Sequence, residues 1–528
     1  MTYRFPQAPL DIPSSWFLAG ILIFAALLRQ IFFTGFFGSD EVTYTEAAWK
    51  IAHGDWQSSD YIGAIRYGVN FPVALFFRLF GYTEFVANLW SMLCSLGEIA
   101  LVYLLAYGFW GRQAAIFSAV LLAVTPIHAH IAGRLMADSP LGFFITLSFY
   151  SLWRGDDQNS KFWYFMAGLA AGGVWWVKSA VAIIYLPAFL TYIAWERRFD
   201  WKWLYMAASF LAMFILNCLV HWRISGEPFL IFRISTTGTS ISVPASMTQT
   251  DACFYLNYLF IDVKHTLLLG PLALMGFILW ARRSSSGIGI TRVALWGGSL
   301  VILFSLFIVG LNPIKLIPKQ SNYMLIFLAP LALMGGFFLH RLRQIYAWSI
   351  LGAAMLGGVI LTAMEQQVVQ AFTANSKAAL DFAKDHTDKP VFSMTNANRM
   401  ATYNALFTPN PDNQPKILSM SQVSSELNHR RGSVSGAAGI LAYAIIDVMT
   451  LGWGAGESIL RLEDRPACWI PNGTLQPTGF GLGRSVVKLA HYTAAMIPGN
   501  IGQRLSGKID ELFNPKLAYV YGIPESCI

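Results

Sequence analysis

The sequence predicts an α-helical polytopic membrane protein with a small C-terminal α/β domain. Of its 528 residues, 55% are hydrophobic and only 12% are charged, which is too little polar surface for a soluble globule of this length. The apolar residues stand in blocks near the ~20 residues needed to cross a hydrocarbon core. From about Glu365 the composition becomes polar. We therefore expect a membrane domain over 1–364 and a soluble domain over 365–528.

We expect about eleven transmembrane helices. The first block, Trp16 to Phe33, is longer than the apolar core of a signal peptide and predicts a retained anchor. The two blocks beside Lys178 are short, and one broken helix is the alternative to two spans. The predicted spans are 16–35, 84–107, 113–131, 139–153, 162–177, 179–195, 203–221, 265–281, 293–311, 321–339 and 345–364.

The distribution of basic residues predicts the orientation in the membrane. The net charge of +8 is scattered at block edges and not gathered on one face, so it does not indicate a nucleic-acid partner. With the N-terminus in the cytoplasm, the short inner loops carry a set of Lys and Arg residues, as the positive-inside rule requires. This set is Arg112, Arg154, Lys161, Arg197, Arg198, Lys202, Arg282, Arg283, Arg292, Arg341 and Arg343. An odd number of crossings leaves the C-terminal domain outside the cytoplasm, so we expect a multi-pass protein of the inner (plasma) membrane.

Two long loops lie on the outer side under this topology, from about Phe36 to Thr83 and from about Trp222 to Lys264. The inner loops are short turns, and this asymmetry indicates that the outer face carries the function. In the tail, short apolar runs at 390–394, 416–420 and 439–446 alternate with helix-like stretches, which is typical of a small α/β domain.

The five cysteines show no spacing typical of a zinc site. If the tail lies outside the cytoplasm, Cys468 and Cys527 have two alternatives, a disulfide or two unpaired thiols.

The first outer loop holds an adjacent pair of acids, Asp40 and Glu41, directly after the first span. Charged residues so close to a membrane usually face a cavity or a partner. In the alternative interpretation Ser39 caps a helix, and the two acids merely occupy its favourable first turn.

A further acid, Asp138, lies at the predicted outer end of a helical hairpin, between Arg134 and Pro140. It is either a second acidic group in the outer cavity or the cap of a helix that Pro140 opens.

Cations accumulate on the same outer side, although the positive-inside rule disfavours them there. This predicts an anionic partner, such as a lipid-linked phosphate, whereas a snorkelling residue or a structural ion pair is the alternative for any single member. Arg66, His265 and Lys319 are the strongest candidates because they flank apolar blocks that we expect to face the cavity. The full set is Lys50, Arg66, Arg78, Arg134, Arg223, Arg233, Lys264, His265, Lys315 and Lys319, with Lys178 between two short spans.

Acids and bases at a lipid-facing cavity suit group transfer from a polyprenyl-phosphate carrier. Cleavage of a sugar-phosphate bond leaves a phosphate dianion, which Arg or Lys stabilises. A carboxylate meanwhile accepts the proton of the acceptor.

These motifs resemble the GT-C superfamily of membrane glycosyltransferases, in its branch of protein O-mannosyltransferase-like and aminoarabinose or galacturonosyl transferase-like enzymes. The resemblance covers nearly all of the membrane portion. The matching features are Asp40-Glu41 with Tyr44, Glu46 and Gly54-Asp55-Trp56, the Arg134 to Pro140 turn, Lys178 after Gly172-Gly173, and Lys319 to Tyr323 leading to Ala329-Pro330.

The resemblance implies an inverting transfer, with Asp40 as base, Glu41 as its neighbour and Asp138 as a supporting acid. It also implies basic residues on the carrier phosphate, and our candidates for that role are Arg66, Arg134, Lys178, His265, Lys319 and Tyr323. Lys178 departs from the family pattern, because many relatives have Thr before and Gly after it where this chain has Val177 and Ser179. We expect no cofactor; a divalent metal on Asp40 and Asp138 is the less favoured alternative.

Two other classes of function compete with this interpretation. A secondary transporter or lipid flippase also carries intramembrane charges, and a structural scaffold would use its acids only as helix caps. For the transferase the expected partners are a polyprenyl-phosphate sugar donor, a lipid, glycan or protein acceptor, and membrane lipids. The sequence predicts neither the sugar nor the acceptor.

Overall fold

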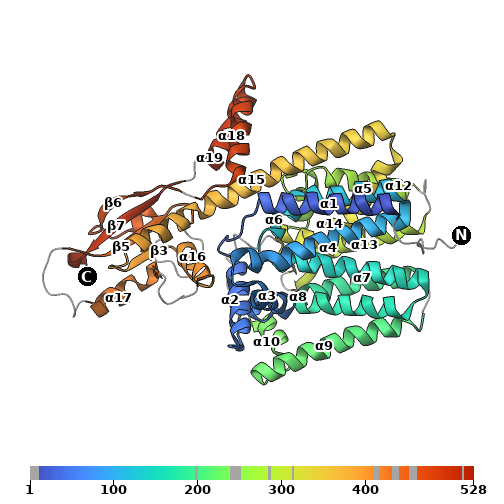
Figure 1. The fold of residues 1–528 in the computed structure, drawn as a ribbon, viewed down its shortest axis with the longest axis horizontal. Helices are drawn as coiled ribbons and strands as arrows, with labels where there is room; N and C mark the ends of the chain where they lie inside the picture. The colour runs from blue at the N-terminus through green and yellow to red at the C-terminus, as the bar shows by residue number, and fades with distance from the viewer. Residues whose placement is uncertain are drawn as a thin grey trace. The chain divides into compact units, whose positions relative to one another are not determined.

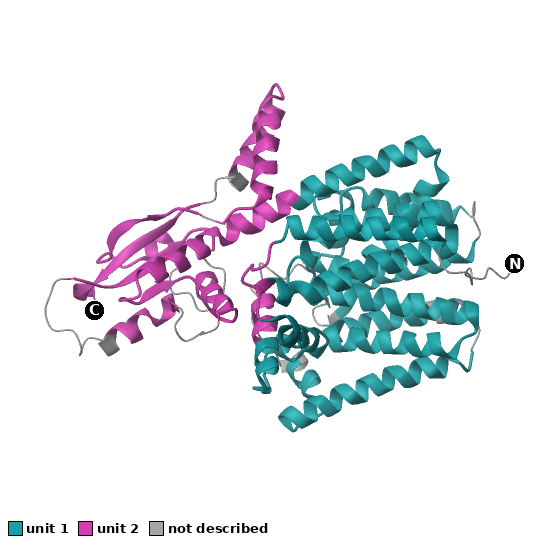
Figure 2. Ribbon diagram, in the orientation of Figure 1, with its two compact units in different colours: residues 1–33, 47–81, 85–362 teal, residues 34–46, 82–84, 363–528 magenta. Residues whose placement is uncertain are grey.

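The structure is a computed structural model of the whole chain, and its helices dominate the fold (Figure 1). It describes residues 11–196, 200–237, 251–282, 287–311, 314–408, 415–430, 439–450, 461–477, 479–513 and 516–527. These residues form two compact units, coloured separately in Figure 2. Unit 1 contains 1–33, 47–81 and 85–362, and unit 2 contains 34–46, 82–84 and 363–528.

Unit 1 is a helical bundle with one short β-hairpin. The segment 40–46 of α2 and the end of α15 beyond Thr362 belong to unit 2. Its elements are α1 (Ile12–Ile31), α2 (Asp40–His53), η1 (Ile62–Ile65), α3 (Tyr67–Phe80), α4 (Glu84–Trp110), α5 (Arg112–Val124), α6 (Pro126–Ala132), α7 (Asp138–Gln158), α8 (Lys161–Glu196), α9 (Trp203–Ser225), α10 (Leu230–Thr237), α11 (Phe254–Phe260), α12 (Leu269–Ala281), α13 (Ile288–Leu306), β1 (Ile308–Leu311), β2 (Ile314–Leu316), η4 (Ser321–Met324), α14 (Leu325–Arg341) and α15 (Gln344–Asp385).

Among the described residues, seven helices are long and apolar enough to cross a membrane, or eight if the bent pair α5 and α6 is one span. The predicted count of about eleven is higher than this number. The two predicted spans beside Lys178 form a single helix, α8, with a break at Lys178, and the span predicted over 265–281 is the 13-residue helix α12. Helix α3 is a further short apolar helix, inside what was predicted as an outer loop.

Local sequence explains where several of these helices begin and bend. Asp11 accepts a hydrogen bond from the backbone N–H of Ser14 at 2.9 Å and so caps α1. Thr125 has extended backbone angles, and Pro126 then opens α6 as a new helix bent by 62° from α5.

A chain of polar contacts runs through the interior of the bundle and joins α1, α4 and α6. Arg29 donates from Nη2 to His128 Nδ1 at 2.8 Å, and His128 Nε2 lies 3.1 Å from Glu98 Oε2. Because a guanidinium can only donate, Nδ1 is the acceptor and the proton of His128 resides on Nε2, which donates to Glu98. Thr146 of α7 donates to the other oxygen of Glu98 at 3.1 Å. These buried polar groups therefore satisfy one another.

Unit 2 is built on a five-stranded mixed sheet with the strand order β4-β3-β5-β7-β6 (Figure 1). Strand β3 pairs in parallel with β4 and β5, whereas β7 pairs antiparallel with β5 and β6. The runs predicted as strands over 390–394, 416–420 and 439–446 contain or overlap β3, β4 and β5. The elements are β3 (Val391–Ser393), α16 (Thr395–Ala405), β4 (Ile417–Ser419), η6 (Met420–Gln422), α17 (Val423–Arg430), β5 (Ile440–Asp447), η7 (Leu462–Asp464), β6 (Ile470–Leu475), α18 (Leu482–Ala495), α19 (Asn500–Phe513), β7 (Ala518–Pro524) and η8 (Glu525–Cys527).

Each face of this sheet has its own apolar core. Tyr443 and Ile445 of β5 belong to a cluster with the end of α15 and with α16, whereas Ala442 and Ala444 belong to a cluster with Leu427 of α17. Side chains alternate between the faces because the strand period is two residues. Strand β5 is consequently buried on both sides, whereas the edge strand β6 is mostly exposed.

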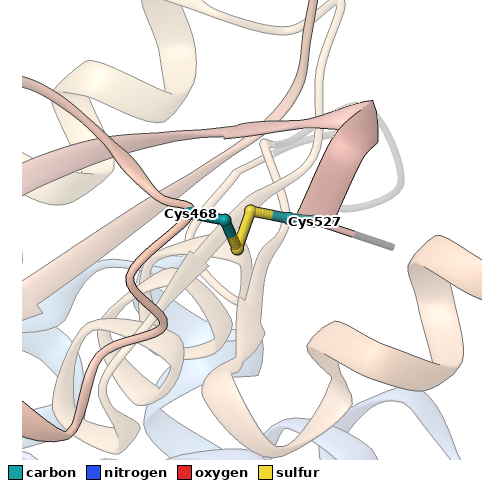
Figure 3. Close-up of a disulfide and its surroundings, with 2 residues drawn as sticks. All are labelled: Cys468 and Cys527. Carbon is teal, nitrogen blue, oxygen red and sulfur yellow. A yellow bond between two sulfur atoms is a disulfide. The ribbon is translucent and has the colours of Figure 1, made fainter.

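A disulfide between Cys468 and Cys527 links the segment before β6 to the one after β7 (Figure 3). Of the two alternatives left open by the sequence, the structure has the disulfide. Cys94, Cys218 and Cys253 are free thiols.

Candidate active site

The break in α8 places the ammonium of Lys178 inside the bundle of unit 1. Lys178 has φ −157° and ψ 85°, which interrupts the helix. The preceding pair Gly172-Gly173 lets neighbouring helices approach α8, because a Cβ on these residues would meet Met213 of α9 at 2.4 Å and Phe144 of α7 at 2.6 Å. The Nζ atom of Lys178 lies 3.2 Å from Oδ1 of Asp138. Lys178 is 8% exposed and Asp138 1%.

Asp138 is the first residue of α7, and both of its oxygens are engaged. Oδ1 pairs with Lys178, and Oδ2 accepts a hydrogen bond from Nδ2 of Asn322 at 2.8 Å. The helix N-terminus favours a carboxylate at this position, as the alternative interpretation expected. However, the partners of Asp138 come from α8 and η4, so this acid also joins three elements.

An aromatic ring completes the surroundings of Lys178. Its ammonium lies 4.0 Å from the ring centroid of Tyr323, a distance at which a cation is attracted to the π face. Tyr255 of α11 is fully buried close to this group. Burial raises the pKa of the Tyr255 phenol, and the neighbouring Tyr323 and Asp138 add to that shift. Tyr255 is therefore a neutral hydrogen-bonding group at physiological pH.

Lys319 presents a different environment three residues before Asn322. Lys319 is 1% exposed, and among the described residues its ammonium donates to the backbone carbonyl of Ile317, at 3.4 Å. Within the ranges that the structure describes, no carboxylate lies within ion-pair distance of this ammonium. Burial lowers the pKa of Lys319, and the attraction of Asp251 opposes that shift in part. Such a site favours an anion that brings its own charge.

The remaining predicted cations lie elsewhere in unit 1. Arg134 is 8% exposed on the connection between α6 and α7, four residues before Asp138. The ring of His265 stacks on Tyr258 with centroids 5.2 Å apart, and its carbonyl accepts from Ile127 N at 3.0 Å. Arg66 precedes α3. Among the described residues, neither His265 nor Arg66 contacts Asp138 or Lys178.

The two acids predicted in the first outer loop, Asp40 and Glu41, belong to unit 2. Glu41 is fully buried, and its Oε1 accepts the backbone N–H groups of Phe37, Gly38 and Ser39 at 2.8, 2.6 and 3.0 Å. Glu41 thus shapes the loop that carries Asp40. The hydroxyl of Tyr44, one helical turn later, donates to Oδ2 of Asp40 at 3.3 Å.

This loop is fixed to the core of unit 2. Gly38 has φ +97°, and a Cβ there would meet the side-chain oxygen of Asn396, so only glycine fits. Arg399 donates to the carbonyl of Gly38 at 2.6 Å, and Phe36 packs on Tyr403 with ring centroids 5.3 Å apart. Asp40 was predicted within the membrane domain over 1–364, and in the structure the segment 34–46 that contains it groups with unit 2.

Two features of the site were not predicted from the sequence. Asn322 holds Asp138, although only its neighbours Lys319 and Tyr323 were singled out; its place inside the same motif was the available signal. Tyr255 lies in the middle of a loop that gave no such signal. Within the described residues, no group of three or more His, Cys, Asp or Glu side chains is placed to hold a metal ion.

Comparisons with known proteins agree with this architecture. Residues 68–222 match the family model described as dolichyl-phosphate-mannose-protein mannosyltransferase. Over 200 residues the chain is 28% identical to an undecaprenyl phosphate-alpha-4-amino-4-deoxy-L-arabinose arabinosyl transferase of Pseudomonas paraeruginosa, a match covering 35% of this chain and 36% of that protein. It is 27% identical over 128 residues to YkcB of Bacillus subtilis, covering 24% of this chain and 18% of that protein. The chain thus spans about a third or less of these relatives.

The structural likeness extends much further than the sequence likeness. The crystal structure of ArnT from Cupriavidus metallidurans in the apo state superposes with a TM-score of 0.54 at 15% identity, covering 83% of this chain and 93% of ArnT. The structure of the same protein bound to undecaprenyl phosphate gives a TM-score of 0.52. The chain has the fold of the GT-C membrane glycosyltransferases, and its resemblance to that superfamily, predicted from its motifs, is confirmed.

Proposed function

We propose that this protein transfers a sugar from a polyprenyl-phosphate carrier to an acceptor hydroxyl, with inversion at the anomeric carbon. The fold, the partial family match and the carrier bound in the ArnT structure support this proposal. The proposal depends most on the surroundings of Lys319. This lysine is 1% exposed, and among the described residues its ammonium donates to one backbone carbonyl. Such a buried ammonium is suited to bind a phosphate group.

In the proposed step, the acceptor oxygen attacks the anomeric carbon on the face opposite the carrier. The bond between that carbon and the phosphate oxygen breaks, and its electron pair leaves with the carrier phosphate. Asp40 takes the proton of the acceptor hydroxyl as general base. Lys319 stabilises the charge that develops on the leaving phosphate, together with Arg134, Arg66 and His265.

The Asp138–Lys178 pair has a positioning role in this scheme. Asp138 and the ring of Tyr323 hold the Lys178 ammonium in one place. A preorganised cation stabilises developing charge without reorganising at the moment of reaction.

We place the reaction on the extracytoplasmic side of the inner membrane, with the N-terminus in the cytoplasm. The disulfide of unit 2 supports this side, because disulfides persist in oxidising compartments. The distribution of Lys and Arg between long and short loops gives independent support.

Reconstitution in nanodiscs tests the proposal. Undecaprenyl-phosphate sugars are supplied with an extract of envelope lipids and proteins as acceptor, and release of undecaprenyl phosphate is measured. A transferase releases the carrier phosphate only when acceptor is present, whereas a flippase moves the carrier without cleaving it. Acceptor-independent transport with no release would overturn the transferase.

Asp40→Asn should lower the rate of carrier release by roughly 100-fold or more, the scale of a lost general base. The protein should still fold, because the three backbone N–H groups that Glu41 accepts hold the loop. The matched control is Asp60→Asn, since the side chain of Asp60 is 84% exposed, and it should keep the wild-type rate. Wild-type activity in Asp40→Asn would remove Asp40 from the mechanism.

A further inference from the structure

Helices α18 and α19 of unit 2 form a hairpin that carries a row of exposed apolar side chains. Leu482, Leu489 and Met496 recur at intervals of seven residues and therefore lie on one face of α18. The turn and α19 carry further exposed apolar residues. The exposed members are Leu482, Leu489, Tyr492, Met496, Ile497, Ile501 and Leu505, with Met496 80% exposed.

The two helices of the hairpin pack closely against each other, so the exposure of these apolar residues follows from the fold. Gly502 of α19 packs so closely that a Cβ would meet the carbonyl oxygens of Ile497 and Ala494 at 2.0 and 2.8 Å. Farther along, Ser506 and His491 form a hydrogen bond of 3.3 Å between the two helices.

The base of the hairpin is fixed to the continuous helix α15. Gln370 accepts the backbone N–H of Gly481 at 2.7 Å, and Gln366 accepts that of Gly483 at 2.9 Å. A Cβ on Gly483 would lie 2.4 Å from the carbonyl oxygen of Ala363, so only glycine permits this approach. The hairpin thus begins at a fixed position along α15, beside residues 363–370.

This position on α15 lies just beyond the apolar segment, where the surface of the membrane is expected. Helix α15 is one of the candidate spans, and its apolar segment ends at Met364. Gln366 and Gln370 follow within about 9 Å at a rise of 1.5 Å per residue, which is comparable with the ~5 to 8 Å of headgroup on each side of a bilayer. Exposed apolar residues at Leu356, Ile360 and Val368 show that this helix presents an apolar stripe up to the same level.

The charge of the hairpin fits the same location. Figure 1 shows α18 and α19 standing away from α15. Between 482 and 513 the basic residues Arg484, Lys488, Arg504 and Lys508 outnumber the acids Asp510 and Glu511 by four to two. Apolar residues flanked by Lys and Arg are typical of helices that lie in an anionic lipid interface.

We propose that the α18–α19 hairpin is an interfacial anchor, which inserts its apolar row among the headgroups and upper acyl chains of an anionic bilayer. This inference does not depend on the transferase activity.

Spin labelling of the full-length protein tests the anchor. The label is placed at Met496→Cys in a background in which the free thiols carry Cys94→Ala, Cys218→Ser and Cys253→Ser, with the disulfide kept oxidised. The matched control is Asn472→Cys, an exposed position on β6. Collision with oxygen, which concentrates in lipid, is compared with collision with a water-soluble nickel complex, in nanodiscs of phosphatidylcholine with phosphatidylglycerol.

The anchor predicts that the label at 496 collides more with oxygen than with nickel, and that the label at 472 shows the reverse. Removal of phosphatidylglycerol should shift position 496 toward water. Nickel access at 496 equal to that at 472 would overturn the proposal. Protection from both agents would also overturn it, because a second copy or another protein would then cover the hairpin.

Discussion

Lys178 and Lys319 are both buried lysines in unit 1, yet their surroundings differ in kind. Lys178 has a carboxylate at 3.2 Å and an aromatic ring at 4.0 Å, whereas Lys319 has one backbone carbonyl at 3.4 Å. The first charge is balanced within the protein and contributes to its structure. The second has no carboxylate within ion-pair distance in the described part of the chain, and in our proposal the carrier phosphate balances it. A stability measurement and a binding measurement should therefore separate the two lysines.

The largest effect is expected where the balanced pair is broken. Asp138→Ala leaves Lys178 as an uncompensated buried charge and should destabilise the fold by about 3–5 kcal/mol. Thermal unfolding in detergent measures the loss. The double variant Asp138→Ala with Lys178→Met should recover most of it, because both charges are then absent. If Asp138→Ala unfolds at the wild-type temperature, Lys178 is no better balanced than Lys319.

Lys319→Gln should behave in the opposite way. It removes a buried charge for which the described ranges hold no carboxylate within ion-pair distance, so the unfolding temperature should stay the same or rise. The affinity for undecaprenyl phosphate should fall by about 10- to 100-fold, since a hydrogen bond to a charged group contributes about 1.5–3 kcal/mol. Titration of nanodisc-embedded protein measures this affinity, and Lys264→Gln at an exposed lysine is the matched control. Unchanged affinity would make Lys319 a structural residue.

Tyr323→Leu sharpens the comparison from the side of the aromatic ring. The substitution keeps an apolar neighbour but removes the π face beneath Lys178, and should cost about 0.5–2 kcal/mol of stability. In an Asp138→Ala/Lys178→Met background, where the cation is missing, the same substitution should cost less. Equal losses in both backgrounds would assign the effect to packing alone.

The smallest effect is a pH dependence confined to Lys319. Because burial lowers its pKa and only the ammonium binds phosphate, carrier affinity should be greatest below this pKa and fall as pH rises through it. The affinity begins to fall at a lower pH than it would for a lysine with an ordinary pKa. At the pH equal to the pKa of Lys319, the affinity is about twofold below its maximum. Affinity is measured from pH 7.5 upward, where the phosphate no longer titrates. Lys319→Arg should flatten the profile, and an equal slope in that variant would exclude Lys319 as its source.

Sequence patterns predicted the parts of this site that local rules control. The short blocks on either side of Lys178 indicated a break, and α8 is interrupted at that residue. Asp138 stands at a helix start, as its place between Arg134 and Pro140 suggested. Apolar blocks also indicated most of the long helices, because a helix that crosses the membrane must be apolar over the thickness of the hydrocarbon core.

The contacts between the side chains of the site were not predictable from the sequence, because they depend on which helices pack against each other. Nothing in the neighbourhood of Asn322 shows that its amide reaches Asp138, 184 positions earlier in the chain. The charge of Glu41 suggested chemistry, but three backbone N–H groups that converge only in the folded loop occupy one of its oxygens. Helix α3 was missed because it is too short to register as a span.

The polar chain of Arg29, His128 and Glu98 has a consequence for biosynthesis. Helix α1 leaves the ribosome before α4 and α6, carrying an arginine whose partner His128 is made 99 residues later. An isolated arginine is costly in lipid, so α1 should stay at the edge of the translocation channel, with Arg29 near water, until α4 and α6 emerge. Membrane insertion of α1 is then a late event, completed together with its neighbours.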